Sequence, residues 1–191
     1  MISFEVPVSI ELDSKDWDSL FSVSISKIYK RKEFLVEAGK VNQSLFLIQK
    51  GAVKKTYTSV DGKESIFEFA YNSDWIFDVN GIAEGQKASK AIQAIKETHA
   101  YVLNREQYVQ LSKHNITLKL YFDKIFSKSL LKHEKRMKQL LAYSAQDRYK
   151  VFQKDYPGLE LLVPQNQIAA YLGISPEFLS VLRNKRLSGR D

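Results

Sequence analysis

Residues 165–184, QNQIAAYLGISPEFLSVLRN, have the pattern of two short helices that cross at a steep angle. Two such helices need a small residue where they touch, and Ala169 supplies it. The tight turn between them needs a residue that adopts a positive φ, and Gly173 supplies that. Ser175 can cap the second helix, and Pro176 suits its first position, where a missing N–H has no helical partner. The apolar residues that would close the small core are Ile168, Leu172, Ile174, Leu179 and Leu182.

This pattern predicts a helix-turn-helix, which places the exposed start of its second helix in the major groove of DNA. Glu177 could accept a hydrogen bond from a cytosine amino group, and Ser180 could approach several bases. Basic residues at the end of the helix suit phosphates, which add affinity without sequence choice. A plain helical hairpin is the alternative, although it would share only part of the pattern. The predicted DNA-binding residues are Gln165, Ser175, Pro176, Glu177, Ser180, Val181, Arg183, Asn184, Lys185 and Arg186.

Positive charge is concentrated in the same part of the chain. The 191 residues carry a net charge of +7. Residues 1–112 hold 14 Lys/Arg against 15 Asp/Glu, a net charge of −1, whereas residues 113–191 hold 15 against 7, a net charge of +8. This asymmetry favours a near-neutral front part and a rear part that faces a polyanion such as double-stranded DNA. The alternative is a Lys-rich helix face that is simply solvated.

The front part reads as one short helix followed by strands. Asp13 or Ser14 can cap the helix, and Trp17, Leu20 and Phe21 share one face of it. From residue 28 to 103, short apolar runs alternate with turn residues, and Asp61-Gly62 forms a strong hairpin turn. Such strands, without intervening helices, indicate an antiparallel sandwich, barrel or jelly roll.

A helix capped by Asn104 and Gln107 leads into a much longer one, over residues 116–143, which contains no Gly or Pro. At ~1.5 Å per residue this helix is about 40 Å long, so we expect it to pair with its own symmetry mate. Its basic residues, Arg136 among them, are expected on the remaining surface; the alternative is a helix that lies along its own barrel. The predicted dimer-interface residues are Leu118, Phe122, Phe126, Leu130, His133, Met137 and Leu140.

The whole arrangement resembles the cyclic-AMP receptor protein/FNR family of bacterial transcription regulators. Residues 34–39 (FLVEAG) and 44–51 (SLFLIQKG) look like the sensor domain of that family, and residues 168–177 (IAAYLGISPE) are similar to its DNA-binding end. The resemblance implies an α+β fold. It comprises an N-terminal antiparallel β-barrel or jelly roll like a cyclic nucleotide-binding domain, a long dimerisation helix and a C-terminal helical (winged-)helix-turn-helix domain.

The resemblance also implies boundaries and partners. The sensor domain would span residues 1–115, the dimerisation helix residues 116–143 and the DNA-binding domain residues 144–191. Because the sequence ends at Asp191, we expect the β-hairpin wing to be reduced or absent. The protein would be a cytoplasmic homodimer that binds operator DNA, with RNA polymerase as a further candidate partner.

The sequence departs from the nucleotide-binding members of this family. In those members a Gly-Glu-Leu turn holds the ribose and an Arg-Ser/Thr-Ala turn holds the cyclic phosphate. A buried phosphate needs a charge-assisted partner, and Ala88 stands where the arginine would be. We therefore expect a degenerate effector pocket that does not bind cyclic AMP or cyclic GMP, and the effector, if one exists, stays unidentified. The matching residues are Phe77, Asp78 and Val79 in the first turn and Ala88 and Ser89 in the second.

Several other classes of function are excluded or disfavoured. The chain has no cysteine, so disulfides, thiolate metal sites and thiol catalysis are excluded. Its three histidines, His99, His114 and His133, are far apart in the sequence, so we expect no metal site, no cofactor and no catalytic residues. No apolar run approaches the ~20 residues of a membrane span. The main alternative is a sensor or scaffolding module of this fold that has lost specific DNA binding; Val181, where family members commonly carry an arginine, favours it.

Overall fold

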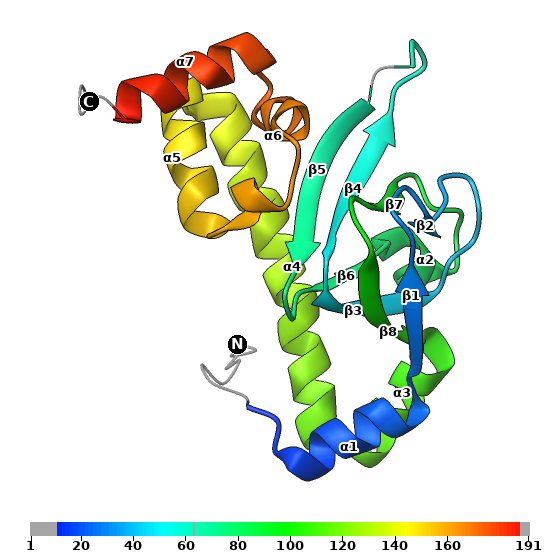
Figure 1. Ribbon diagram of the computed structural model, residues 1–191. Coiled ribbons are helices and arrows are strands. Elements are labelled where there is room, and N and C mark those ends of the chain that lie inside the picture. The colour runs from blue at the N-terminus through cyan, green and yellow to red at the C-terminus, as the bar shows by residue number, and fades with distance from the viewer. Residues whose placement is uncertain (1–10, 63, 188–191) are drawn as a thin grey trace, which may run out of the picture.

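A single long helix, α4 (Ile116–Ala142), runs along the molecule from the base of a β-barrel to a small helical head (Figure 1). The computed structural model describes residues 11–62 and 64–187. The helix begins where Asn115 accepts a hydrogen bond from the backbone N–H of Leu118, at 3.1 Å. Its bounds confirm the long uninterrupted helix that the sequence predicts. No helix of the described residues is both long and apolar enough to cross a membrane.

The barrel consists of two four-stranded antiparallel sheets, which confirms the predicted jelly-roll class. Each sheet mixes strands from distant parts of the chain. The first sheet has the order β1 (Ile25–Tyr29), β8 (Thr98–Asn104), β3 (Ser44–Lys50) and β6 (Trp75–Phe77). The second sheet has the order β2 (Phe34–Val36), β7 (Ala91–Ala94), β4 (Ala52–Thr58) and β5 (Glu64–Tyr71).

The two sheets enclose an apolar interior because alternate residues of a strand point to opposite faces. Phe46 and Ile48 of β3 point inward, as do Val53 of β4 and Ala70 of β5, and all four are fully or almost fully buried. The residues between them point outward, where helices cover both sheets.

The outer face of the first sheet packs against three helices: α1 (Ser14–Val23), α3 (Arg105–His114) and the first half of α4. Asn104 forms the predicted capping box at the start of α3, and Asp13, one of the two predicted caps of α1, forms a capping box with Asp16. Leu20, Leu45 and Phe122 lie at the centre of this layer with no exposed surface. The layer fixes the lower half of α4 against the barrel.

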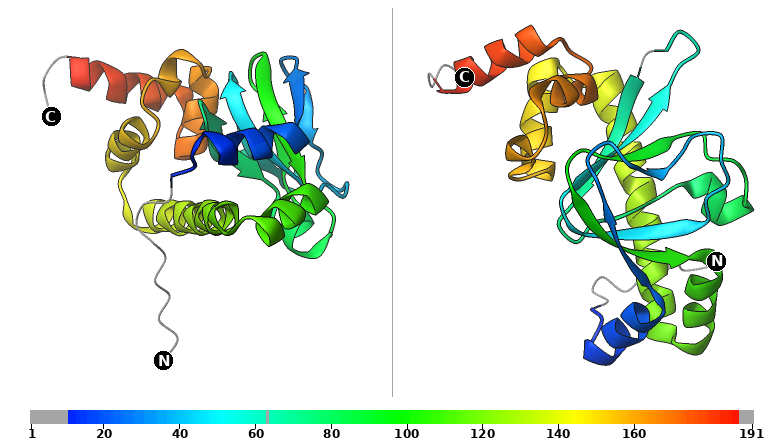
Figure 2. Two further views of the ribbon diagram at one scale, coloured as in Figure 1. Left: turned by 90° about the horizontal axis from the view of Figure 1, so that it is seen from below. Right: turned by 45° about the vertical axis from the view of Figure 1, so that its right-hand side comes forward.

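The outer face of the second sheet packs against the head, which consists of α5 (Ala145–Asp155), η1 (Leu159–Leu161), α6 (Gln165–Leu172) and α7 (Pro176–Leu187). In both views of Figure 2 the head lies beside β5. Phe69 of β5 is fully buried against the rings of Phe152, Tyr156 and Tyr171, with ring centroids 6.4, 6.1 and 5.3 Å away. An aromatic cluster therefore joins the head to the barrel.

A short helix, α2 (Val79–Glu84), interrupts the run of strands between β6 and β7. The prediction of strands without intervening helices was therefore wrong at this point. Asp78 caps α2 by accepting a hydrogen bond from the backbone N–H of Gly81, at 2.8 Å. A side chain at Gly81 would collide with the carbonyl oxygen of Asn42, so glycine is needed here for α2 to lie against the preceding loop.

Candidate nucleic-acid interface

Helices α6 and α7 meet through the turn that the sequence singles out. Gly173 ends α6 in the left-handed conformation, with φ = 69°, which is costly for residues with a side chain. The backbone N–H of Ile174 then donates to the carbonyl of Ala169 at 3.0 Å. Ala169 has no exposed surface, so a larger side chain would have no room where the two helices meet.

The core of this unit consists of the predicted apolar residues. Ile168 and Leu172 of α6 pack with Leu179 and Leu182 of α7, and each is at most 7% exposed. Ile174 in the turn is partly buried against the same cluster. The side of α7 that faces away from this core is consequently left at the surface.

The start of α7 is capped and negatively charged. The hydroxyl oxygen of Ser175 accepts a hydrogen bond from the backbone N–H of Phe178 at 3.2 Å. The backbone N–H of Glu177 and the hydroxyl of Ser175 hold the pKa of the Glu177 carboxyl below its ordinary value. Glu177 is therefore ionised at neutral pH and can only accept hydrogen bonds, as a contact to a cytosine amino group requires.

Most predicted DNA-contacting side chains lie on the exposed surface of α6 and α7. Arg183 is half-buried, and the side chains of Lys185 and Arg186 lie outside the described residues. The hydroxyl of Ser180 donates to the carbonyl of Pro176 at 3.1 Å, so it faces a base as an acceptor while that bond is made. The exposed predicted residues are Gln165, Ser175, Pro176, Glu177, Ser180, Val181 and Asn184.

Sequence reasoning missed Phe178, whose side chain is 45% exposed between Glu177 and Leu179. It lies one turn before Val181, which is 47% exposed, so the two form an apolar pair on the outer side of α7. The sequence could have indicated this exposure, because Phe178 is apolar but is not one of the predicted core positions of the helix pair. An exposed apolar pair on a recognition helix suits contact with thymine methyl groups.

Two arginines are used inside the protein to join helix ends. Arg148 donates from Nε to the carbonyl of Leu172 at 2.9 Å and from Nη1 to the carbonyl of Tyr143 at 2.8 Å. Arg136 donates to the carbonyl of Tyr171, and its guanidinium lies over the Tyr171 ring. Arg136 is only 9% exposed, so the prediction that it lies on the surface was wrong. Its aliphatic stem and flat guanidinium pack on the aromatic ring instead.

The two turns expected to form the effector pocket contain two buried residues, Asp78 and Ala88. The Asp78 carboxylate is 4% exposed and already caps α2. Ala88 is 2% exposed and is held by hydrogen bonds of its backbone to Gly39 and Lys40, whereas Val79 and Ser89 are exposed. No guanidinium therefore stands at the Ala88 position, and the carboxylate is used by the protein itself.

Phe77 is another residue expected to form the effector pocket, but its ring does not point into the barrel. Its ring points outward from the first sheet and packs edge-on against Phe126 of α4, with centroids 5.1 Å apart. It therefore fills the space between the sheet and α4, not the interior of the barrel, because it shares the outer face of its strand with Trp75.

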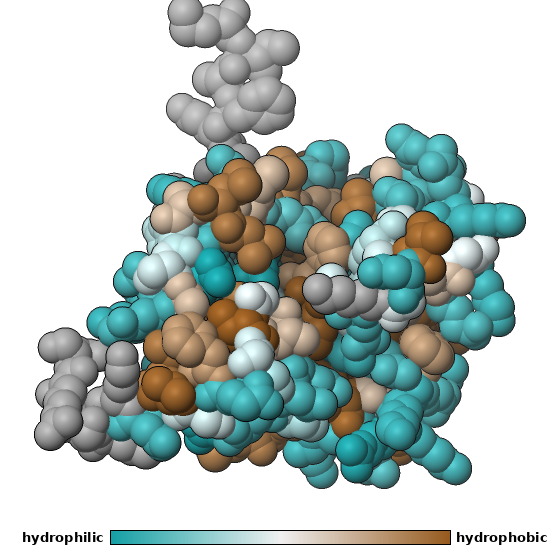
Figure 3. All heavy atoms as spheres, turned by 90° about the horizontal axis from the view of Figure 1, so that it is seen from above, coloured by the Kyte–Doolittle hydropathy of each residue, from teal (hydrophilic) through white to brown (hydrophobic). Residues whose placement is uncertain are grey.

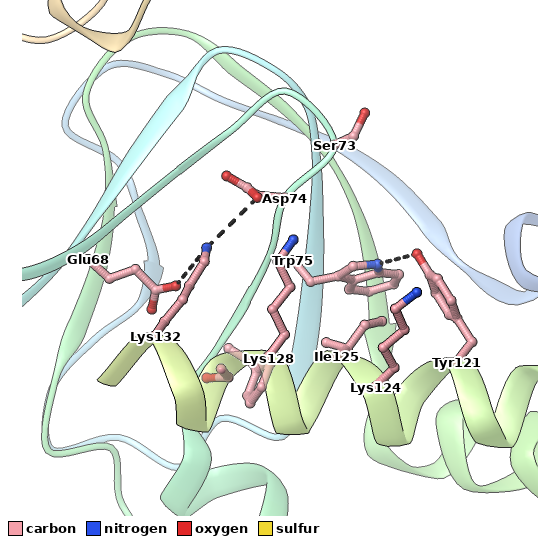
Figure 4. A pocket seen from close by; sticks show the side chains of 11 residues that line it. Glu68, Ser73, Asp74, Trp75, Tyr121, Lys124, Ile125, Lys128 and Lys132 are labelled. Atoms are coloured by element: carbon pink, nitrogen blue, oxygen red, sulfur yellow. Dashed lines mark hydrogen bonds and ion pairs between the residues drawn. The ribbon is translucent and has the colours of Figure 1, made fainter. Parts of the chain in front are cut away.

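A buried ion pair lies where α4 crosses the second sheet. Lys55 of β4 donates to Glu68 of β5 at 2.9 Å, and the two residues are 3% and 5% exposed. From α4, Lys132 Nζ lies 3.5 Å from Glu68 and 3.9 Å from Asp74 (Figure 4). His133 Nε2 lies 3.9 Å from Glu68. The Glu68 carboxylate thus joins both strands to the long helix.

The pKa values of this network follow from its burial and its charges. Burial alone would raise the pKa of Glu68, but the positive charges of Lys55 and Lys132 and the hydrogen bond from Lys55 lower it overall. Burial, followed by the charge of Lys55, lowers the pKa of His133. Glu68 is therefore charged and His133 neutral at pH 7, so the network presents a carboxylate beside α4.

The predicted dimer-interface residues divide into two groups. Leu118 and Phe122 have no exposed surface because they pack against α1 and α3 within one chain, so they cannot contact a partner. Phe126 is half-buried against Phe77, and His133 faces Glu68. Leu130, Met137 and Leu140 are 70%, 59% and 51% exposed, and their neighbours Leu131 and Leu141 are exposed as well. The apolar surface of α4 therefore lies in its second half.

Comparison with known proteins was made for both sequence and structure. Residues 26–115 match the family model of the cyclic nucleotide-binding domain. No curated protein sequence matches the chain. The solved structure of FixK2 from Bradyrhizobium japonicum is 19% identical, with 87% of this chain and 86% of that chain covered and a TM-score of 0.76.

Two further solved structures cover nearly the whole chain. CLP from Xanthomonas campestris, a c-di-GMP responsive global regulator, is 14% identical over 93% of each chain, with a TM-score of 0.71. A structure assigned to the CRP/FNR family of transcriptional regulators, from Eubacterium rectale, is 17% identical, with 93% of this chain and 85% of that chain covered and a TM-score of 0.67. Residues 26–115 are therefore similar to a cyclic nucleotide-binding domain, and the chain has the fold of the CRP/FNR transcription regulators.

Proposed function

We propose that this protein is a transcription regulator that binds operator DNA as a homodimer. The observation that carries the proposal is the exposed outer side of α7, which holds an ionised acceptor and an apolar pair above a closed core. A helix used only for packing would not need polar side chains on its free side that can contact the edges of bases. The net charge of +8 over residues 113–191 supplies the attraction to phosphates that such binding requires.

The exposed apolar surface of α4 supports pairing of two chains. Leu130, Met137 and Leu141 follow one another at spacings of seven and four residues, as along a coiled-coil seam, and each is more than half exposed. Two chains paired there would set their recognition helices to meet successive major grooves, about 34 Å apart, on a near-palindromic site. The operator is then expected to have two half-sites one helical turn apart.

We expect sequence-specific, salt-dependent DNA binding by the full chain. A preferred site is first selected from a pool of random duplexes, and it is then titrated against a scrambled duplex at roughly 50 and 200 mM salt in a mobility-shift assay. The selected site should bind at least ~10³-fold more tightly than the scrambled one. E177Q should relax the choice of one base, while S112A, in α3 far from the head, should not.

The mobility-shift assay also separates the proposal from its alternative. Weak binding that is equal for both duplexes, with no change in E177Q, would show a sensor or scaffolding module without operator recognition. A steep loss of affinity with salt alone would not rescue the proposal, because phosphate contacts carry no sequence information.

We also infer that neither cyclic AMP nor cyclic GMP is the effector. A cyclic phosphate beside Ala88 would be desolvated without a charged donor. Calorimetric titration of the full chain with each nucleotide should show a Kd weaker than about 1 mM. Micromolar binding of either nucleotide would contradict this inference.

A further inference from the structure

A groove of 580 Å³ lies between β5, the second half of α4 and α6. Its walls are mainly apolar and include Phe67 from β5, Met137 and Leu140 from α4, and Ala170 from α6. Figure 3, which looks down on this end of the molecule, shows hydrophobic side chains exposed among polar ones. The volume falls within the range of roughly 300–1,000 Å³ that is usual for small-molecule sites.

Three basic side chains line the same groove, and none of its lining residues is acidic. They are Lys90, His133 and Arg136. Within the part of the chain that the structure describes, no carboxylate lies within ion-pair distance, 4.0 Å, of Lys90 or Arg136. Lys90 instead lies over the ring of Phe67, with Nζ 5.0 Å from its centroid. The groove thus combines apolar walls with unbalanced positive charge.

The unbalanced positive charge is energetically unfavourable at Arg136. One guanidinium nitrogen donates to the carbonyl of Tyr171, but the other, Nη1, is buried and has no hydrogen-bond partner. His133 Nε2 is also buried and has no hydrogen-bond partner, because Glu68 lies 3.9 Å away and is already bound by Lys55. A buried cation without a carboxylate is unfavourable, so an anion that accepts from Arg136 would be stabilised there.

We propose that this groove binds an organic anion with an apolar body, of the class of medium-chain carboxylates. The carboxylate accepts a hydrogen bond from Arg136 Nη1, and the chain lies along Phe67, Met137 and Leu140. Charge complementarity selects the head group, because an alcohol of the same length leaves Nη1 without a charged partner. The apolar walls select the tail, because acetate leaves them in contact with water.

A second copy of this chain is the competing occupant. Met137 and Leu141 lie at the outer edge of the groove, and a partner helix could cover them and place its own Glu134 towards Arg136. The test must therefore measure both ligand binding and the mass of the particle in solution.

The test is a calorimetric titration of the full chain, without DNA, with octanoate, 1-octanol and acetate. Octanoate should bind at least about tenfold more tightly than either of the others. R136M should weaken octanoate binding about tenfold and leave 1-octanol unchanged. K138M is the matched control: it removes a cation two residues away, about 160° around α4 from Arg136, and should change binding less than about twofold.

A second pair of variants does not disturb the buried guanidinium. Ser65 of β5 lines the groove and is exposed, so both S65Q and S65E should fold. The two new side chains have the same size, but S65E adds a negative charge to the wall of the groove. Octanoate should bind S65E at least about tenfold more weakly than S65Q, whereas 1-octanol should bind both alike.

Three results would overturn the proposal. The first is equal binding of octanoate and 1-octanol, and the second is unchanged octanoate binding by R136M and S65E. The third is no octanoate binding by a chain whose sedimentation shows a dimer that E134Q dissociates, which would assign the groove to a second copy. Because no DNA is present, these results test the groove alone, and the mobility-shift assay tests DNA binding alone.

Discussion

Replacing Glu68 with leucine is expected to lower the free energy of unfolding by about 3–5 kcal/mol, because the change leaves a buried cation without its partner. The Lys55 side chain is only 4% exposed, so water cannot replace the lost carboxylate. Lys132 on α4 loses the same contact, although it is 30% exposed and can be rehydrated. Urea unfolding of E68L and of the unchanged protein at pH 7 measures the difference.

The double variant K55M/E68L is the control for this prediction. It removes both charges and fills the space with apolar side chains, so it should recover most of the stability that E68L loses. If E68L and K55M/E68L are equally unstable, the loss does not come from the unpaired lysine, and the ion-pair explanation fails.

The same pair should make stability depend on pH. The pKa of Glu68 is lower in the folded chain than its ordinary value of 4.5, so its contribution is complete above that value and is lost as the pH falls through the folded pKa. Unfolding followed from pH 7 downward should show this acid-dependent loss in the unchanged protein and a smaller one in K55M/E68L.

Truncating Phe69 to alanine should cost about 3–5 kcal/mol of stability, as expected for a fully buried ring. Phe69 is the residue of the barrel that contacts three aromatic rings of the head. The cavity would therefore open at the junction of the two parts, and the surrounding rings cannot collapse into it without moving the head. Thermal and urea unfolding measure this loss.

Phe67 provides the matched control, two residues earlier on the same strand. Its ring contacts that of Tyr57 instead of the aromatic rings of the head and is 36% exposed, so F67A should cost no more than about 1 kcal/mol. Equal losses in F69A and F67A would contradict the importance of the aromatic cluster.

Features that depend on neighbouring residues could be predicted from the sequence. The caps at Asp13 and Asn104, the left-handed Gly173 and the long α4 all follow from short-range rules, and the structure confirms each of them. The order of these elements was enough to identify the fold. The exposed side of α7 could also be predicted, because the core positions of that helix determine which side remains at the surface.

Features that depend on contacts between distant elements could not be predicted. Lys55 and Arg136 are charged, so their sequence context suggests exposure, yet both are buried by segments far away in the chain. The stripe of α4 is apolar along its whole length, and only the barrel determines that Leu118 faces inward while Leu130 remains free. Helix α2 was missed because its start depends on the Asp78 cap and on the close fit of Gly81.

The position of Arg148 restricts which movements are open to the head. One guanidinium bridges the last turn of α4 and the last turn of α6, so the corner at Tyr143 and Ser144 cannot swivel without breaking two hydrogen bonds at once. Lys135 and Asp155 also tie α4 to the far end of α5 with an ion pair of 2.6 Å. Any reorientation of the head must therefore arise in one of two ways: α4 bends before Lys135, or the head separates from β5. In both cases the corner between α4 and α5 moves as a rigid unit.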